Sequence, residues 1–180
     1  MATQPTDLSK PYIPVVGEVR DGYSKENEAT ATCMCGAVQL AFPTSYPGVV
    51  TRFVCHCLDC RKVTATMFAS NFTVQDPYLR YVRGKEELKQ WSQSRSIGTG
   101  NNMANHFCGK CGTLMYRASS GFPGKYFMRI GTVDDYHLHE TKLRPQVEQF
   151  VESRVGWLKP IEGVKQVRGM HTFADVKGVL

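Results

Sequence analysis

Alternating hydrophobic and polar positions recur along the chain, and this period of two predicts short β-strands. The runs are rich in β-branched and aromatic residues, and most of them are ended by proline, glycine or aspartate. The pattern predicts strands over residues 37–42, 49–54, 66–74, 79–82, 113–118 and 126–130, with a weaker alternation over 146–151.

Helical periodicity is scarce in the same sequence. Residues 58–65 are compatible with one short helical turn, and no long amphipathic helix is found. Residues 97–105 are predicted to form a polar loop and residues 119–125 a turn, because glycine and polar residues gather there. The prediction is therefore a mainly β fold with little helix.

The first 28 residues differ from the rest by their polar, proline-containing composition. They are expected to form an irregular N-terminal arm that packs on the body through Tyr12 and Ile13. Residues 29–180 are expected to form a single domain, since 180 residues suit one hydrophobic core.

Composition narrows the class of protein further. The sequence contains no apolar run long enough to cross a bilayer and no apolar stretch that resembles a signal peptide. Seven cysteines with metal-ligand spacing in such a chain indicate a reducing compartment, so a cytoplasmic location without membrane partners is expected.

The net charge is +6 and the isoelectric point about 9.0. The basic residues are scattered, whereas nucleic-acid binders more often carry a basic stripe with interleaved aromatic residues. The surplus charge is as well suited to attracting an anionic small molecule, and nucleic acid is not the favoured partner.

All seven cysteines lie in three short clusters, which read Cys33-Met-Cys35-Gly, Cys55-His-Cys57-Leu-Asp-Cys60 and Cys108-Gly-Lys-Cys111-Gly. An odd number excludes a complete set of disulfides, and close pairs followed by glycine are typical of thiolates that bind zinc. Four ligands close a structural zinc site, whereas three leave a position for water or substrate. The count suggests one site of each kind.

The glycine-flanked pair Cys108 and Cys111 needs a second pair, and Cys33 with Cys35 is the best candidate. The central cluster has three cysteines within six residues and can bind one ion without outside help. In an extended segment His56 points away from its neighbours, so it is expected to be a packing or hydrogen-bonding residue. Spacing alone leaves other divisions of seven into four and three open.

The succession CMCGAV, CHCLDCRK, FCGKCGTLMY and GTVDD, with a late Trp157, resembles the glutathione-dependent formaldehyde-activating enzyme family, also called the GFA or CENP-V domain family. The likeness runs from about Cys33 to Trp157. It implies a Mss4-like fold of twisted antiparallel sheets pinned by two Zn²⁺ ions per chain. It assigns Cys33, Cys35, Cys108 and Cys111 to a structural zinc, and Cys55, Cys57 and Cys60 to a catalytic zinc.

The activity this implies is a carbon–sulfur lyase or synthase, an S-(hydroxymethyl)glutathione synthase-like enzyme. A thiol such as glutathione would add to formaldehyde or another aldehyde, since a zinc ion held by three thiolates is suited to binding a fourth sulfur. Candidate partners for substrate carboxylates are Arg52, Arg61 and Lys62, which flank the central cluster. Asp134 and His106 are candidates for proton transfer.

Several alternatives accompany this reading. Asp134 and Asp135 are more often turn-capping residues than acids, and His137 with His139 would share one face of a strand as ordinary polar residues. The enzyme could act on another reactive carbonyl or thiol-conjugated metabolite. A chromatin- or nucleic-acid-associated zinc protein, and a purely structural protein with His56 or His106 as a fourth ligand, are the non-enzymatic alternatives.

Overall fold

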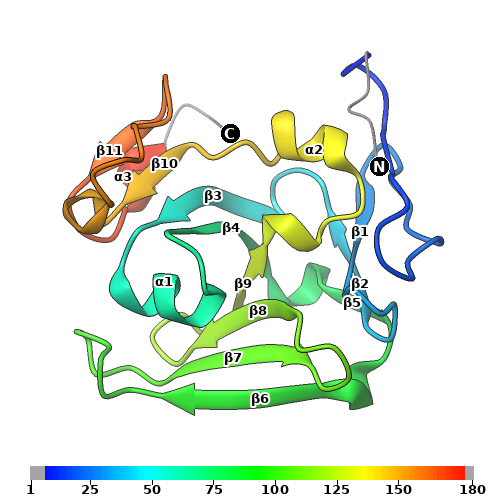
Figure 1. The fold of residues 1–180 in the computed structure, drawn as a ribbon, viewed down its shortest axis with the longest axis horizontal. Helices are drawn as coiled ribbons and strands as arrows, with labels where there is room; N and C mark the ends of the chain where they lie inside the picture. The colour runs from blue at the N-terminus through cyan, green and yellow to red at the C-terminus, as the bar shows by residue number, and fades with distance from the viewer. Residues whose placement is uncertain (1–6, 177–180) are drawn as a thin grey trace.

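The computed structural model describes residues 7–176 and consists mainly of β-strands arranged in two sheets (Figure 1). The chain order of the elements, with the 3₁₀ turns written η, is as follows: β1 Glu28–Thr32, β2 Gln39–Pro43, β3 Val49–Cys55, α1 Leu58–Thr64, β4 Ala69–Gln75, η1 Asp76–Tyr78, β5 Arg80–Arg83, η2 Lys85–Glu87, β6 Leu88–Gln93, β7 Met103–Cys108, β8 Leu114–Ser119, β9 Lys125–Arg129, η3 Ile130–Thr132, α2 Tyr136–Glu140, β10 Val147–Gln149, η4 Val151–Ser153, β11 Lys165–Val167 and α3 Phe173–Val176. The predicted mainly β class is confirmed.

The larger sheet has eight strands in the order β11-β10-β3-β4-β9-β8-β7-β6 and crosses the molecule in Figure 1. The neighbouring pairs in the part β3-β4-β9-β8-β7-β6 are all antiparallel, as predicted. The pairs β3–β10 and β10–β11 are parallel, which the sequence did not predict. The chain reaches β10 by a long connection through α2, and such crossovers allow parallel pairing where a hairpin does not.

The smaller sheet, β1-β2-β5, packs beside the larger one and shares its main hydrophobic core. Phe42 of β2 and Phe72 of β4 are fully buried, with ring centroids 4.8 Å apart. Burying side chains of this size contributes about 1.5–3 kcal/mol each to folding. This core lies on one face of the larger sheet and leaves the opposite face of its central strands for other contacts.

The strands that the alternation predicted are present, with bounds shifted by a few residues. The sequence missed β1, β6, β7 and β11, and the start of β7 falls within the predicted loop 97–105. In β6 four of the six residues are exposed, so this strand carries little hydrophobic alternation. Trp157, the last residue of the family resemblance, has 72% of its surface exposed.

The segment with His137 and His139 is helix α2, and the prediction of a shared strand face is wrong. Asp135 begins this helix, and its carboxylate accepts a hydrogen bond from the His137 amide at 3.0 Å. Residues two apart on a helix point in different directions, so the two imidazoles are not presented together. The capping role expected for Asp135 is confirmed.

The described part of the N-terminal arm, residues 7–27, is irregular and contacts the body through Tyr12, as predicted. The Tyr12 amide donates to the Asp135 carboxylate at 2.7 Å, and its carbonyl accepts from the Tyr136 amide at 2.8 Å. These contacts tie the arm to the start of α2. The division of the chain at residue 28 stays a prediction.

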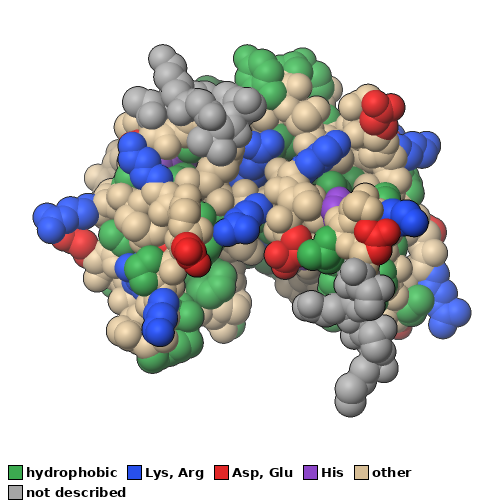
Figure 2. Space-filling model, turned by 90° about the horizontal axis from the view of Figure 1, so that it is seen from above, with side chains coloured by type: hydrophobic (Ala, Val, Ile, Leu, Met, Phe, Trp, Pro, Cys, Tyr) green, Lys and Arg blue, Asp and Glu red, His purple; other side chains and the backbone are tan. Residues whose placement is uncertain are grey.

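Charged side chains of both signs are interspersed on the face shown in Figure 2, where Lys and Arg form no continuous band. Among residues 7–176, no helix combines the length and the apolar character that a membrane span requires.

Candidate functional site

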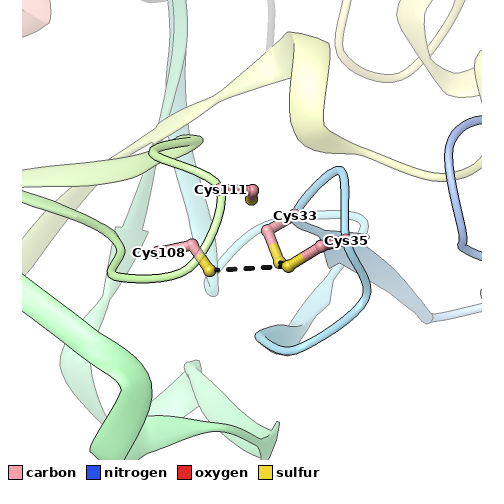
Figure 3. Close-up of side chains that lie close together, drawn as sticks. All are labelled: Cys33, Cys35, Cys108 and Cys111. Carbon is pink, nitrogen blue, oxygen red and sulfur yellow. Dashed lines mark hydrogen bonds between the residues drawn. The ribbon is translucent and has the colours of Figure 1, made fainter.

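The first cysteine group joins two loops that are distant in sequence (Figure 3). Cys33 and Cys35 lie in the loop after β1, whereas Cys108 ends β7 and Cys111 follows in the turn before β8. The Sγ atoms of Cys33 and Cys35 are 3.7 Å apart, and those of Cys35 and Cys108 are 3.8 Å apart.

These spacings fit one metal ion. Zinc–sulfur bonds of about 2.3 Å at tetrahedral angles place sulfurs about 3.8 Å apart, whereas a disulfide places them about 2.0 Å apart. Gly36 and Gly112 follow the two pairs with φ of +73° and +76°, a left-handed conformation that glycine adopts without strain. All four ligand atoms lie within 4.8 Å of one another, so this group could hold a metal ion.

The environment of the group supports that reading. The Val38 amide donates to Cys33 Sγ at 3.2 Å, and the Thr113 hydroxyl lies 3.2 Å from Cys111 Sγ. Burial raises the pKa of the Cys33 thiol to about 12. A bound cation reverses this effect and holds such a sulfur as the thiolate.

The second cysteine group is built locally. Cys55 is the last residue of β3, Cys57 caps α1, and Cys60 lies in the first turn of that helix. The Cys60 amide donates to Cys57 Sγ at 3.4 Å, which turns the short segment back on itself. The three sulfurs lie within 4.8 Å of one another, with Cys55 and Cys60 buried and Cys57 half-buried. This group too could hold a metal ion.

His56 lies between two of these cysteines, but its side chain is held elsewhere. Its Nε2 atom is 3.0 Å from the Glu148 carboxylate, and both side chains are 2% exposed. Burial raises the pKa of Glu148, but hydrogen bonds from His56, Gln166 and the Ile161 amide outweigh it and the net shift is downward. His56 therefore anchors the cysteine segment to β10, which agrees with the predicted hydrogen-bonding role.

Two buried arginines beside the central group were not found from the sequence. Arg117 of β8 and Arg129 of β9 are each 6% exposed. Arg117 Nη1 lies 3.4 Å from Cys60 Sγ, and Arg129 donates to the Asn71 side-chain oxygen. Within the described residues neither forms an ion pair with a carboxylate.

Burial lowers the pKa of Arg129 to about 10, which still leaves it charged at neutral pH. Buried charges require a counter-charge, and thiolate sulfurs are the anionic groups available to this pair. The arginines meet the cysteines only through strand pairing, since Arg129 lies opposite Asn71 and Arg117 opposite Phe127. No local motif marks them.

A cavity of about 760 Å³ opens beside the central cysteines. One face of β3, β4, β8 and β9 forms its floor, and the loop after β6, the turn between β8 and β9 and the C-terminal segment around His171 form its other walls. Cys55, Cys57 and Cys60 lie at its wall with both arginines. The central group is therefore accessible to a small molecule.

The cationic residues proposed from the sequence do not line this cavity. Arg52 is on the opposite face of β3 from Phe53 and Cys55, since successive strand residues alternate. Arg61 donates to the Ser153 carbonyl at 3.1 Å, and with Lys62 it lines an open hollow at α1 that borders the cavity at Asp59 and Ser96. Substrate contact by these three residues is not supported by their positions.

The two proton-transfer candidates also lie elsewhere among the described residues. Asp134 accepts hydrogen bonds from the Thr30 and Thr32 hydroxyls, at 2.5 and 2.6 Å, beside the smaller sheet. The His106 ring stacks on Tyr116 with centroids 4.4 Å apart. Tyr116 and Arg117 are neighbours in β8 and point to opposite faces, so His106 is on the face away from the central cysteines.

The protein is thus mainly β and has two cysteine groups that could hold metal ions, one of them beside a cavity. These features place it among proteins with cysteine-rich sites suited to metal ions. The chain belongs to the glutathione-dependent formaldehyde-activating enzyme family, whose model matches residues 28–153. The resemblance seen in the sequence is thereby confirmed.

A crystal structure of a Rhodobacter sphaeroides protein is similar at 20% sequence identity and a TM-score of 0.43, covering 77% of this chain and 98% of that one. No curated protein matches the chain significantly.

Proposed function

We propose that this chain is a zinc-dependent carbon–sulfur lyase or synthase that forms or cleaves a thiol–aldehyde adduct. The observation that carries the proposal is the group Cys55, Cys57 and Cys60 at the wall of a cavity with two buried arginines. The family is described as glutathione-dependent and formaldehyde-activating, so S-hydroxymethylglutathione is the reference adduct.

The two cysteine groups would have different tasks. Cys33, Cys35, Cys108 and Cys111 supply four ligands, enough to close a structural zinc site. Cys55, Cys57 and Cys60 supply three, which leaves one coordination position for a substrate. When bound there, zinc would hold a substrate thiol as its nucleophilic thiolate at neutral pH.

Formal charge favours such a substrate. Three thiolates and one Zn²⁺ sum to about −1, and Arg117 with Arg129 raise the local total to about +1. A substrate thiolate would bring it to about zero, whereas a neutral ligand would leave two buried cations only partly compensated. Arg117 and Arg129, rather than Arg52, Arg61 and Lys62, are therefore the cations we propose to act at this site.

In the synthetic direction the substrate sulfur uses a lone pair to form a bond to the carbonyl carbon. The carbonyl π pair moves to the oxygen, which takes up one proton, and the product is a hemithioacetal. The cleavage reaction is the exact reverse, so no redox partner is needed. Arg117 and Arg129, which line the cavity, would stabilise the developing oxyanion as hydrogen-bond donors.

His171 is the candidate for moving that proton. It lines the cavity, and its Nδ1 atom is 2.7 Å from the Gln149 side-chain oxygen, while Gln149 lies opposite Cys55 in the sheet. Burial lowers the pKa of His171, so its imidazole is neutral at pH 7. It could accept the proton that the substrate thiol loses and then donate the same proton to the oxyanion. Asp134 and His106 do not have this access.

The function is tested by exchange NMR of formaldehyde with glutathione, using protein whose zinc content has been measured. We expect exchange well above the spontaneous rate, in proportion to protein concentration. No acceleration by fully zinc-loaded protein would reject glutathione and formaldehyde as its pair. Tight, salt-sensitive binding of short DNA by the same sample would instead support the nucleic-acid-associated alternative.

Replacing Arg117 by methionine is expected to weaken thiol binding by about tenfold to a hundredfold while both zinc ions remain. The reason is the loss of a charge-assisted hydrogen bond, worth about 1.5–3 kcal/mol, next to Cys60. Thiol affinity by calorimetry and zinc by elemental analysis measure the two effects. Arg20→Met, at an exposed position of the arm, is the control, and Arg117→Lys should recover part of the affinity. Unchanged affinity in Arg117→Met would refute the electrostatic role.

A further inference from the structure

Four rings follow one another along the cavity that holds the central cysteines. Phe122 contacts Phe127 with centroids 5.8 Å apart, Phe127 contacts Phe53 at 6.3 Å, and Phe53 contacts His171 at 4.9 Å. All four residues line the same cavity. We call this continuous row the aromatic wall.

Further apolar side chains line the part of the cavity that is formed by loops and by the C-terminal segment. Ile97 lies in the loop between β6 and β7, Met103 is the first residue of β7, and Phe150 and Met170 belong to the C-terminal part of the chain. Thioether side chains adapt to ligand shape and contact aromatic groups favourably. The cavity is therefore largely apolar along these walls.

Charged groups are distributed unevenly around this cavity. Arg117 is within 3.4 Å of Cys60 Sγ, and Arg129 is held beside it through Asn71. Asp59 and Lys125 also line the cavity, and Asp59 accepts a hydrogen bond from the Ser96 hydroxyl at 2.5 Å. Lys125 lies at the far end of the aromatic wall, since it pairs with Gln75 at the end of β4 remote from Cys55. The site thus presents a cationic, sulfur-rich end together with an extended apolar wall.

Glutathione matches only one of these two features. Its thiol and carboxylates suit the end with the cysteines and arginines. Glutathione has no large apolar group, so its peptide and ammonium groups would have to lie against the aromatic rings. Burying such polar groups without hydrogen-bond partners is unfavourable, whereas burying an apolar group against the wall is favourable. Formaldehyde adds a single carbon and would leave most of a cavity of about 760 Å³ unfilled.

We propose that the thiol adduct handled here carries an apolar body the size of an aryl ring, which lies on the aromatic wall while its sulfur and anionic end face the cysteines and arginines. This inference rests on the proposed function for the role of the sulfur. The shape and lining of the cavity supply the rest, since pockets of about 300–1,000 Å³ with apolar walls and a few convergent polar groups bind compounds of this size.

The experiment compares two thiols that differ by one phenyl group, 2-mercapto-3-phenylpropionate and 2-mercaptopropionate. Each is titrated calorimetrically into the zinc-loaded full chain. We expect the phenyl compound to bind at least tenfold more tightly. Equal affinities would overturn the proposal, because the wall would then contribute nothing to binding.

Phe122→Ala shortens the wall at a half-buried turn position between β8 and β9, where loss of the ring is least damaging to the sheet. In this variant most of the preference for the phenyl compound should disappear, while affinity for 2-mercaptopropionate stays the same. Tyr78→Ala removes an aromatic ring of 43% exposure that does not line the cavity, and it should keep the full preference. Full preference retained in a folded Phe122→Ala protein would also overturn the proposal.

A second ligand pair separates this inference from the proposed reaction. 3-Phenylpropionate and propionate have no thiol, so their binding depends on the wall and the arginines alone. If neither thiol binds but 3-phenylpropionate binds at least tenfold more tightly than propionate, the reaction is rejected and the apolar subsite stands. If 3-phenylpropionate and propionate bind with equal affinity, the apolar subsite is rejected, whatever affinities the two thiols have.

Discussion

The Cys108→Ser variant is expected to lose one metal ion per chain and to unfold. Cys108 is fully buried and its sulfur lies 3.8 Å from that of Cys35, so it joins the loop after β1 to the turn before β8. Structural zinc contributes about 10–16 kcal/mol to the folding of small zinc domains, which exceeds or matches the whole stability of a typical domain. Circular dichroism and zinc analysis measure both effects.

Lys110→Ser provides the matched control for that variant. Lys110 lies within the same turn, is exposed, and forms a surface ion pair with Glu87. Exposed ion pairs contribute little, so this variant should keep its fold and both metal ions. A Cys108→Ser protein that melts like the wild type with two zinc ions bound would contradict the structural role of this group.

The Cys57→Ser variant is expected to keep its fold but lose the other metal ion and at least a hundredfold of its exchange activity. Cys57 is half-buried, and its segment is held independently by the His56 side chain on Glu148 and by the His56 amide on the Gln149 carbonyl at 3.0 Å. The backbone therefore does not depend on the metal at this point. Zinc content, thermal melting and exchange NMR together test the prediction.

Leu58→Ser is the control next to that position, because the Leu58 side chain is 68% exposed and offers no ligand. It should retain two zinc ions and full activity. Global unfolding of Cys57→Ser, comparable with that of Cys108→Ser, would mean that the central group is structural and would remove the basis of the proposed reaction.

The features of the fold and site that the sequence predicted are those that depend on a local pattern of residues. The alternation of hydrophobic and polar residues predicted most of the strands between β2 and β9. The glycine-flanked cysteine pairs indicated the group that includes Cys33 and Cys108, although these two residues are 75 positions apart. Alternation requires a buried face and an exposed face, which β6 lacks because it is exposed along most of its length. That strand was not assigned for this physical reason.

The rest of the site depends on the way strands pair, which no local pattern specifies. Arg117 and Arg129 are brought to Cys60 by neighbouring strands, and His171 reaches the cavity through its hydrogen bond to Gln149. By contrast, Arg52 is adjacent in sequence to the central cluster segment but points to the other face of β3. Proximity in sequence was therefore a poor guide to which cations share the cavity.

We propose that Cys55, Cys57 and Cys60 hold a metal ion with one position open to a substrate thiol. The decisive measurement is a titration of 2-mercaptopropionate into cobalt-substituted protein, followed by the sulfur-to-cobalt charge-transfer absorption. We expect this absorption to increase until one thiol is bound per chain, and we expect no increase in Cys57→Ser. An absorption spectrum of fully loaded protein that does not change when thiol is added would mean that the central metal ion has no position open to a thiol, and it would reject the proposed site.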